Sequence, residues 1–306
     1  MDPSFFYIGN LHIPAYFTML TTGFALAVFL ARRWAGQNGL NMGQMVDFGI
    51  LMVIFGVVGA KILHIFADGH FNDYINVCID PSKVDWHVDR QDCTALRGVW
   101  DAAASLCHPV EKSCFAWLSG AGFAFYGGLI AAGGFSIWFI KKHKWPAEKI
   151  ADMGGWTIML GLAWGRMGCL LAGCCFGAVT HSHAGISFPR LSPASREQWL
   201  SGQLDSYRMD SLPVFPTQAY ESAAALLIAA AAYFVVRRYK RYDGQIFIFS
   251  MVSYALVRFL LEFIRRDERG GLLGLSTSQI IAVFMVAACV WMYRIFKNRA
   301  AAVEQN

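Results

Sequence analysis

The sequence predicts an all-α polytopic membrane protein with seven transmembrane helices. Its composition is the first observation: of 306 residues, 56% are hydrophobic and only 15% are charged, whereas soluble globular proteins have about 25% charged residues. The mean hydropathy of +0.40 agrees. This composition argues against a soluble domain, a disordered chain and a nucleic-acid partner, and the net charge of +5 is modest.

The second observation is a series of long apolar segments. A helical span requires roughly 20 mostly apolar residues. Seven segments meet this requirement, at residues 13–31, 46–66, 119–140, 153–176, 219–236, 245–264 and 275–294. Helices are the expected structure because lipid cannot satisfy exposed backbone polar groups. We therefore expect residues 1–306 to form a single seven-helix membrane domain.

The third observation is where lysine and arginine collect, since cytoplasmic loops are enriched in both. Basic clusters follow the first, third, fifth and seventh segments, at residues 32–33, 141–144, 237–241 and 297–299. If the spans alternate, all four clusters lie on one side. The N-terminus is then outside (periplasmic) and the C-terminus cytoplasmic, and residues 1–3 lack the basic start of a cleavable signal. Arg265, Arg266 and Arg269 lie on the outer side and break the rule.

Two long connections then face outward, residues 67–118 and 177–217. The first contains half of the eight cysteines, namely Cys78, Cys93, Cys107 and Cys114. An even number of cysteines in an exported loop is typical of disulfides, and three pairings are open. A metal site that also uses His87 and His108 is the alternative, although no Cys-x2-Cys spacing supports it.

Ionisable residues inside predicted spans are costly and are therefore candidate site residues. The fourth span carries Arg166. In the sixth, Tyr254, Arg258, Glu262 and Arg265 share one helical face. Arg258 and Glu262 either only neutralise each other, or Arg166 and Arg258 together bind a phosphate. Since phospholipid headgroups are the phosphates most available in a membrane, the second interpretation predicts an anionic lipid substrate.

Glycines cluster in two of the spans. Residues 165–177 contain four glycines, and residues 125–129 read Phe-Tyr-Gly-Gly-Leu. Such segments either expose backbone to a substrate, as interrupted helices do where they line a cavity, or allow two helices to pack closely. Both interpretations stay open for the glycines alone.

Five segments resemble motifs of one family. Residues 165–177 correspond to Gly-Arg-x-Gly-Asn-Phe-x-Asn-Gly-Glu-x-x-Gly, residues 126–129 to His-Gly-Gly-Leu and residues 215–221 to His-Pro-(Ser/Thr)-Gln-x-Tyr-Glu. Residues 254–265 are similar to Tyr-x3-Arg-x3-Glu-Phe-x-Arg, and residues 276–279 to Ser-x-Gly-Gln. The matches run in order over nearly the whole chain, which resembles the bacterial prolipoprotein diacylglyceryl transferase family.

The resemblance implies a seven-span enzyme of the bacterial cytoplasmic (inner) membrane. Such enzymes transfer a diacylglyceryl group from phosphatidylglycerol to the lipobox cysteine thiol of exported lipoprotein precursors, and glycerol phosphate leaves. By resemblance, Arg166 and Arg258 would hold the phosphate and stabilise its growing charge. Tyr16 and Tyr254 would orient the headgroup or the glyceryl carbon, and Glu262 would position Arg258. The resemblance implies no metal and no organic cofactor.

Further residues are implied as contacts to phosphatidylglycerol. They share positions in the family's motifs and are Gly127, Gly128, Gly168, Gly177, Gln218, Glu221 and Arg265. Tyr126 occupies the place of the histidine that usually serves as the candidate base for the thiol. By resemblance, Tyr126 is therefore a catalytic candidate.

The departures from the family pattern affect the chemistry. A tyrosine, with a reference pKa of about 10, is a poorer base than a histidine of about 6.5. The base is then His64 or Glu262, or the thiol needs none. Alternatively Cys174 or Cys169, which replace a motif glutamate and asparagine, act as a covalent nucleophile. The alternative without a catalytic role is that these cysteines and Cys175 only pack as small apolar side chains.

Three other functions stay open at this point. The first is a related transferase with the same lipid donor and a different acceptor, suggested by the lost motif residues. The second is a membrane thiol–disulfide oxidoreductase that uses Cys174, Cys175 and the outer cysteines. The third is a lipid-binding protein without catalysis.

Overall fold

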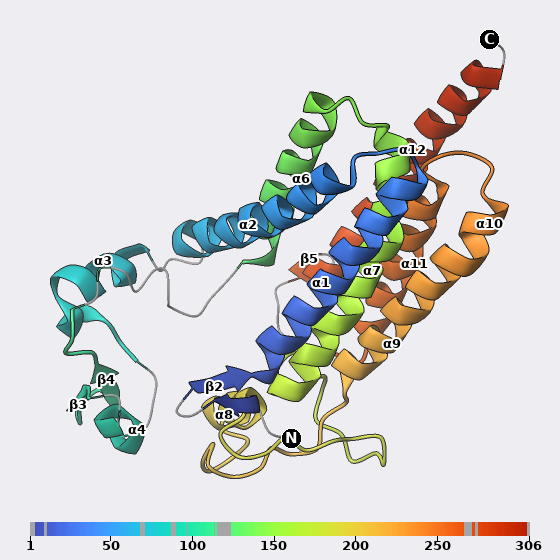
Figure 1. The fold of residues 1–306 in the computed structure, drawn as a ribbon. Helices are drawn as coiled ribbons and strands as arrows, with labels where there is room; N and C mark the ends of the chain where they lie inside the picture. The colour runs from blue at the N-terminus through green and yellow to red at the C-terminus, as the bar shows by residue number, and fades with distance from the viewer. Residues whose placement is uncertain are drawn as a thin grey trace. The chain divides into compact units, whose positions relative to one another are not determined.

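The computed structural model describes residues 4–8, 11–67, 71–86, 90–95, 97–112, 114, 124–265, 271–272 and 275–304 (Figure 1). The chain divides into two compact units. The first comprises residues 1–46 and 145–306, and the second comprises residues 47–144. Each is described by itself.

The first unit is a helix bundle. Its long helices are α1 (Ala15–Gln37), α7 (Ala147–Ala172), α9 (Thr217–Ala230), α11 (Gln245–Leu261) and α12 (Thr277–Glu304). The π-helical turn η2 (Ala231–Val236) and the short α10 (Arg237–Tyr239) continue α9. Helix α7 packs against α1, α9 and α11, and α11 also packs against α12 (Figure 1).

Local sequence explains where the central helices begin and end. Pro14, Pro146 and Pro216 immediately precede α1, α7 and α9, and proline disfavours the helical conformation of the residue before it. Helix α7 ends at Gly173, whose φ of 72° is left-handed, the conformation that most often terminates a helix at glycine. The predicted span 153–176 therefore ends a few residues early, in a turn.

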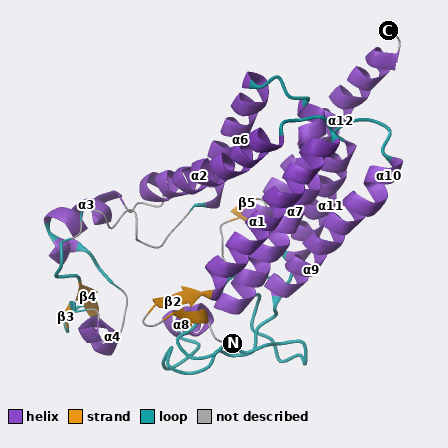
Figure 2. Cartoon of the chain, in the orientation of Figure 1, coloured by secondary structure: helices purple, strands orange, loops and turns teal. Residues whose placement is uncertain are grey.

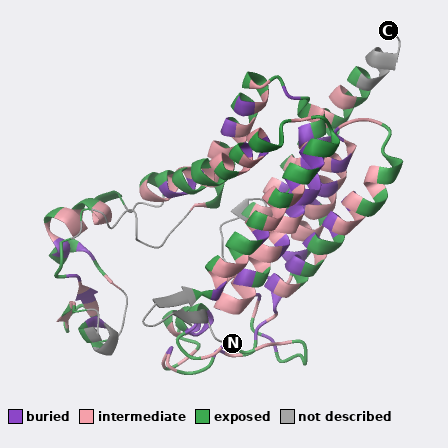
Figure 3. Cartoon of the chain, viewed as in Figure 1, coloured by how far each residue is buried: buried purple, intermediate pink, exposed green. Residues whose placement is uncertain are grey.

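Buried residues of the first unit gather where α7, α9 and α11 face one another (Figure 3). Met159, Ile228 and Ala229 form one apolar cluster, against which side chains of α11 pack. At Gly155 a Cβ would lie 2.8 Å from the Cα of Phe247, so α7 and α11 approach closely there. Interfaces of this kind depend on small residues.

The connection 177–217 has a small core of its own. Helix α8 (Pro193–Leu200) begins after Ser192, whose hydroxyl accepts a hydrogen bond from the backbone of Ser195. Phe188, Ala194 and Val214 are fully buried together. This connection is therefore an ordered element that covers the end of α7, where the Ala194 N–H donates to the Gly173 carbonyl oxygen at 3.1 Å.

The second unit contains two long helices, α2 (Met42–Ala67), whose first turn belongs to the first unit, and α6 (Phe125–Lys142). These helices pack through glycines. A Cβ on Gly127 would overlap the carbonyl oxygen of Gly59, and one on Gly128 would lie 2.9 Å from the carbonyl oxygen of Gly56. Close α2–α6 packing therefore accounts for both glycines of the 125–129 segment.

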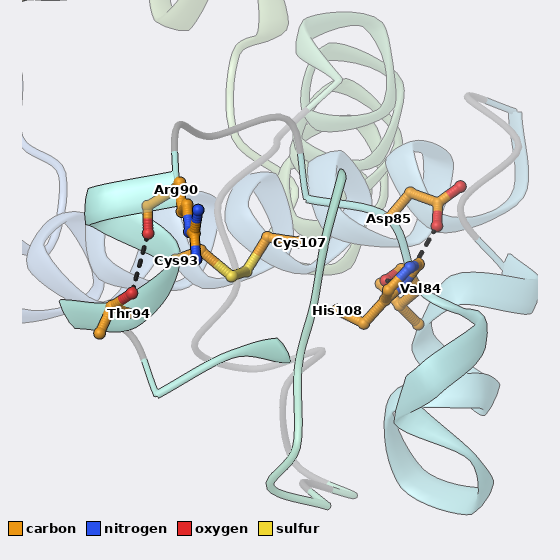
Figure 4. Close-up of a disulfide and its surroundings, with 7 residues drawn as sticks. All are labelled: Val84, Asp85, Arg90, Cys93, Thr94, Cys107 and His108. Atoms are coloured by element: carbon orange, nitrogen blue, oxygen red, sulfur yellow. Dashed lines mark hydrogen bonds and ion pairs between the residues drawn. A yellow bond between two sulfur atoms is a disulfide. The ribbon is translucent and has the colours of Figure 1, made fainter. Parts of the chain in front are cut away.

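The rest of the second unit is held by disulfides. It consists of α3 (Phe71–Ile79), the 3-10 turn η1 (Pro81–Lys83), α4 (Arg90–Ala95), β3 (Val99–Asp101) and β4 (Leu106–His108). The cysteines pair as Cys78–Cys114 and Cys93–Cys107. The second bridge joins α4 to β4 and is fully buried (Figure 4).

These pairings decide between disulfides and a metal site in residues 67–118. All four sulfur atoms are used in bridges, so none is available as a thiolate ligand and the metal interpretation is wrong for the cysteines. His108 instead places its Nδ1 3.3 Å from an Asp85 carboxylate oxygen and 3.0 Å from the Val84 carbonyl oxygen (Figure 4). His87 lies outside the described residues.

The chain is mostly helical, but the all-α prediction missed short antiparallel strand pairs, three of which lie in the described residues (Figure 2). They are β1 (Ser4–Ile8) with β2 (Leu11–Pro14), β3 with β4, and β5 (Gly271–Leu272) with β6 (Leu275–Ser276). Each pair joins or extends elements near a helix end, where hydropathy carries little information.

The structure is that of a helical membrane protein. Within the described residues, four helices are long and apolar enough to cross a membrane, at Ala15–Gln37, Met42–Ala67, Thr217–Tyr239 and Thr277–Arg299, and Gln245–Leu261 is a shorter apolar helix. Each of the seven predicted spans overlaps a helix. The first residues of the predicted span 119–140 lie outside the described part of the chain.

Candidate active site

Arg166 has a carboxylate partner that its own helix does not supply. It lies near the end of α7, and its Nε is 3.1 Å from Oε2 of Glu221, in the first turns of α9. The Glu221 side chain is 1% exposed and that of Arg166 is 20% exposed. One residue further along α9, Ser222 donates a hydrogen bond to the Ala163 carbonyl oxygen at 2.8 Å. This bond fixes α9 against α7 beside the ion pair.

Tyr254 of α11 completes this group. Its hydroxyl donates a 2.7 Å hydrogen bond to Oε1 of Glu221, so the carboxylate meets Arg166 on one oxygen and Tyr254 on the other. Tyr254 is also near enough to both Arg166 and Arg258 to interact with each electrostatically. Glu221 therefore links Arg166 of α7 to Tyr254 of α11.

Arg258 is held from two sides. Its Nη1 is 2.8 Å from Oε2 of Glu262, one turn along α11, and its Nη2 donates a 2.9 Å hydrogen bond to Ser278 Oγ of α12. The four-residue spacing predicted the pair with Glu262. Ser278 was not predicted as a partner, and its only sequence signal is its place in the 276–279 segment.

The start of α9 also holds the turn that follows α7. Gln218 Nε2 donates to the Cys174 carbonyl oxygen at 2.6 Å, and Thr217 Oγ1 donates to that of Cys175 at 3.2 Å. The backbone N–H of Gly177 donates to the Phe215 carbonyl oxygen at 2.9 Å, and a Cβ there would lie 2.8 Å from Thr217 Cγ2. Gln218 and Gly177 therefore shape this turn.

Three free thiols converge in that turn. The sulfur atoms of Cys169, Cys174 and Cys175 all lie within 4.8 Å of one another, a set that could hold a metal ion. The left-handed Gly173 reverses the chain, and Cys175 has a φ of 61°, a conformation that non-glycine residues adopt at a cost. Arg166 interacts electrostatically with Cys169 and Cys175. The sequence singled out the three cysteines but not their convergence.

Tyr16 approaches from α1. Its hydroxyl interacts electrostatically with Arg166 and with all three thiols. A Cβ on Gly168 would lie 3.2 Å from the Tyr16 carbonyl oxygen, so Gly168 allows α1 to approach α7 at this point. Arg265, which follows α11, is 5% exposed and also interacts electrostatically with Cys175.

The cluster retains hydrogen-bonding capacity. Among the described residues, the buried Gln218 Oε1 accepts no hydrogen bond. Glu221 Oε2, Arg258 Nη1 and Glu262 Oε2 are ion-paired without hydrogen-bonding geometry. Buried polar atoms are usually hydrogen-bonded to protein or ordered water, so these atoms have capacity left for a water molecule or a polar ligand.

The remaining candidates belong to the second unit. Tyr126 is half-exposed in the first turn of α6, and Gly127 and Gly128 contact α2. His64 lies in the last turn of α2, edge-on to the Tyr74 ring at 6.4 Å between centroids. Their roles in catalysis stay predictions.

Helices around two buried glutamates, two arginines and two tyrosines define a membrane protein with a polar cluster inside its bundle. The family model "Prolipoprotein diacylglyceryl transferase" matches residues 3–295. The chain belongs to this family, and the assignment from its motifs is confirmed.

Three relatives align over almost their whole length. The chain is 30% identical over 291 residues to phosphatidylglycerol–prolipoprotein diacylglyceryl transferase 2 of Clostridium perfringens (95% of this chain, 93% of the relative). It is 27% identical over 300 residues to the enzyme named phosphatidylglycerol–prolipoprotein diacylglyceryl transferase in Clostridium tetani (98% and 99%). The enzyme of that name in Dehalococcoides mccartyi is 25% identical over 305 residues (98% and 96%).

Proposed function

We propose that this chain transfers a diacylglyceryl group from phosphatidylglycerol to the cysteine thiol of exported lipoprotein precursors and releases glycerol phosphate. Family membership over nearly the full chain supports the reaction class. The observation that carries the proposal is the pair of arginines on α7 and α11, each of which is held by a buried glutamate. Two guanidiniums in a bundle suit a phosphate because each can donate two parallel hydrogen bonds.

In the proposed mechanism the arginines act on the leaving group. Arg166 and Arg258 bind the lipid phosphate, the acceptor thiolate attacks the glyceryl carbon, and the carbon–oxygen bond to phosphate breaks. Its electron pair leaves with glycerol phosphate, whose added charge the arginines stabilise. Glu221 with Tyr254, and Glu262 with Ser278, fix the two guanidiniums. Such positioning avoids reorganisation during the reaction.

Other residues are proposed to complete the lipid site. Tyr16 lies beside Arg166 and the thiols and would orient the headgroup. The proposed lipid contacts are Gly127, Gly128, Gly168, Gly177, Gln218 and Arg265. Tyr126, in place of the family's histidine, is kept as a catalytic candidate.

We further propose that all seven helices cross the bacterial inner membrane as one domain, with the N-terminus periplasmic and the C-terminus cytoplasmic. The disulfides Cys78–Cys114 and Cys93–Cys107 favour an outward position for residues 67–118, since structural disulfides persist in oxidising compartments. The end of α7 is then in the outer half, where exported precursors emerge.

The test is direct observation of transfer. Purified protein is incubated with phosphatidylglycerol and a lipobox peptide, and the peptide is examined by mass spectrometry for a diacylglyceryl adduct on its cysteine. The adduct is expected with the wild type and with Arg33→Ala, which changes an exposed arginine of α1, but not with Arg166→Ala. A peptide with serine for cysteine is the acceptor control. Adduct formation that persists in Arg166→Ala would refute the proposed phosphate site.

A second candidate is a related transferase with another acceptor. The three thiols beside Arg166 favour it, because two of them replace residues of the family's motif. The same assay separates the two functions. Phosphatidylglycerol would be consumed without labelling of the peptide, while another family member labels the peptide in parallel.

A further inference from the structure

The thiols of Cys169, Cys174 and Cys175 have no role in the mechanism above, yet their geometry is close to that of a metal site. All three sulfur atoms lie within 4.8 Å of one another. Zinc–sulfur bonds of about 2.3 Å place two ligands of a tetrahedral site about 3.8 Å apart. The sulfurs therefore need to close by no more than about 1 Å to bind one ion.

Backbone contacts hold the three cysteines together independently of any ion. The Cys174 N–H donates to the Cys169 carbonyl oxygen at 3.1 Å, across the left-handed Gly173. The carbonyl oxygens of Cys174 and Cys175 are bound by the side chains of Gln218 and Thr217. A left-handed non-glycine residue such as Cys175 persists where its surroundings enforce it, often at functional sites.

The charges around the thiols suit a metal thiolate. A divalent ion with three thiolates carries a net charge of −1, and a fourth thiolate makes it −2. Arg166 lies near Cys169 and Cys175, and Arg265 lies near Cys175. Both positive groups favour the anionic complex. The three cysteines are also half-buried, whereas the fourth free cysteine, Cys289, is buried at 3% exposure.

We propose that Cys169, Cys174 and Cys175 bind a thiophilic divalent ion such as Zn²⁺, and that its open fourth position takes the thiol of the acceptor cysteine. Three protein ligands with an open position are typical of catalytic zinc sites. The second half of the inference rests on the proposed function. Coordination to the ion would deprotonate the acceptor thiol without the histidine that Tyr126 replaces, because a metal-bound thiol loses its proton.

The reaction balances without an oxidant or reductant. On coordination, each of the three protein thiols and the acceptor thiol releases one proton to water. The bound thiolate forms the sulfur–carbon bond as the carbon–oxygen bond breaks, and the electron pair leaves with glycerol phosphate. The thioether product is a weak ligand and dissociates from the ion.

Metal binding is tested first, on the full chain in detergent, purified without reductant so that both disulfides persist. Chelator-washed protein is titrated with Co²⁺ and with Zn²⁺. We expect one ion per chain, a thiolate-to-cobalt charge-transfer band and release of protons. Cys289→Ala should behave as the wild type, and Cys169→Ser or Cys174→Ser should bind at least about tenfold more weakly. Absence of binding, or equal binding in Cys174→Ser, would overturn the site.

A measurement on unaltered protein covers the case in which a cysteine variant does not fold. Wild-type protein is alkylated with and without Cd²⁺, and modified cysteines are mapped by mass spectrometry. Protection of Cys169, Cys174 and Cys175 by the ion supports the site. Equal alkylation with and without the ion contradicts it.

The acceptor is tested by its effect on the bound ion. A lipobox peptide should shift the cobalt band and its serine counterpart should not, and chelation should abolish transfer until Zn²⁺ is restored. If the peptide shifts the band but no lipid adduct ever forms, the metal site stands and the proposed function fails. If metal-free protein transfers lipid at the full rate, the inference fails and the function stands.

Discussion

Helix α7 carries Asp152 near its start and Arg166 near its end, and the partners of these two charges differ. Asp152, near its start, is 2% exposed and fully partnered. Its Oδ1 accepts hydrogen bonds from the N–H groups of Ile246 at 2.8 Å and Phe247 at 3.3 Å, which cap the start of α11. Its Oδ2 is 3.1 Å from Nζ of Lys240. Every oxygen of this carboxylate is used within the fold.

Arg166, near the other end of α7, lies in a cluster that is not saturated. Gln218 Oε1 is buried without a hydrogen bond, three atoms of Glu221, Arg258 and Glu262 have only ionic partners, and three thiols stand beside them. A buried charge whose atoms all have partners within the fold, such as Asp152, has no free hydrogen-bonding capacity for a ligand and therefore serves folding. Buried polar atoms are usually satisfied by protein, ordered water or a ligand, so the two ends of α7 are expected to differ in role.

The largest expected effect is on catalysis at the unsaturated end. Replacing Arg258 with alanine, as Arg166→Ala does for the first arginine, should lower transfer by about 10²- to 10³-fold, the usual loss when a donor to a developing negative charge is removed. Peptide labelling with saturating lipid measures it. Activity within threefold of the wild type in either variant would mean that the cluster is structural after all.

At the saturated end the expected effect is on stability. Asp152→Ala removes the α11 cap and leaves Lys240 half-buried without this partner, which should lower the free energy of unfolding by about 3 kcal/mol. Denaturant unfolding in detergent measures it. Activity per folded molecule should be unchanged. A loss of activity without a loss of stability would reverse the roles assigned to the two ends.

Sequence spacing predicted one of the two ion pairs of the site. The pair Arg258–Glu262 follows from four-residue spacing on one helix. The pair Arg166–Glu221 joins two helices, and no local pattern could link them, although both residues stood out as charges in apolar surroundings. Asp152 was missed because it lies at the margin of the predicted span 153–176, where a carboxylate reads as an ordinary helix end.

Helix positions were predicted well and turns poorly, for a physical reason. Hydropathy over about 20 residues reports where a helix can meet lipid, and all seven predicted ranges overlap helices. The convergence of three thiols depends instead on left-handed Gly173 and Cys175 and on hydrogen bonds from α9. Single backbone angles of this kind leave no periodic signal.

A smaller effect should follow from loss of one hydrogen bond inside the unsaturated cluster. Tyr254→Phe keeps the ring but removes the donor to Glu221 Oε1, so Arg166 should be held less rigidly and transfer should fall about tenfold. Tyr233→Phe is the matched control, since Tyr233 lies in the η2 turn and its ring packs on that of Trp156 in α7. Equal activity of the two variants would show that the hydroxyl of Tyr254 does not position the arginine.

The smallest expected effect is on stability and separates the contribution of Lys240 from that of the α11 cap. Lys240 is partly exposed and also pairs with Asp243 at 2.7 Å, so Lys240→Met should cost about 0.5 kcal/mol, far less than Asp152→Ala.

The same ion pair predicts a pH dependence. Burial alone would lower the pKa of Lys240, but its bonds to Asp243 and Asp152 raise this pKa above 10.5. A raised pKa in the folded state means that this stabilisation is complete below pH 10.5 and is lost as the pH rises further. The difference between Lys240→Met and the wild type should therefore be constant through neutral pH and shrink only in strong base. A cost as large as that of Asp152→Ala would mean that the ion pair, and not the cap on α11, holds this end of α7.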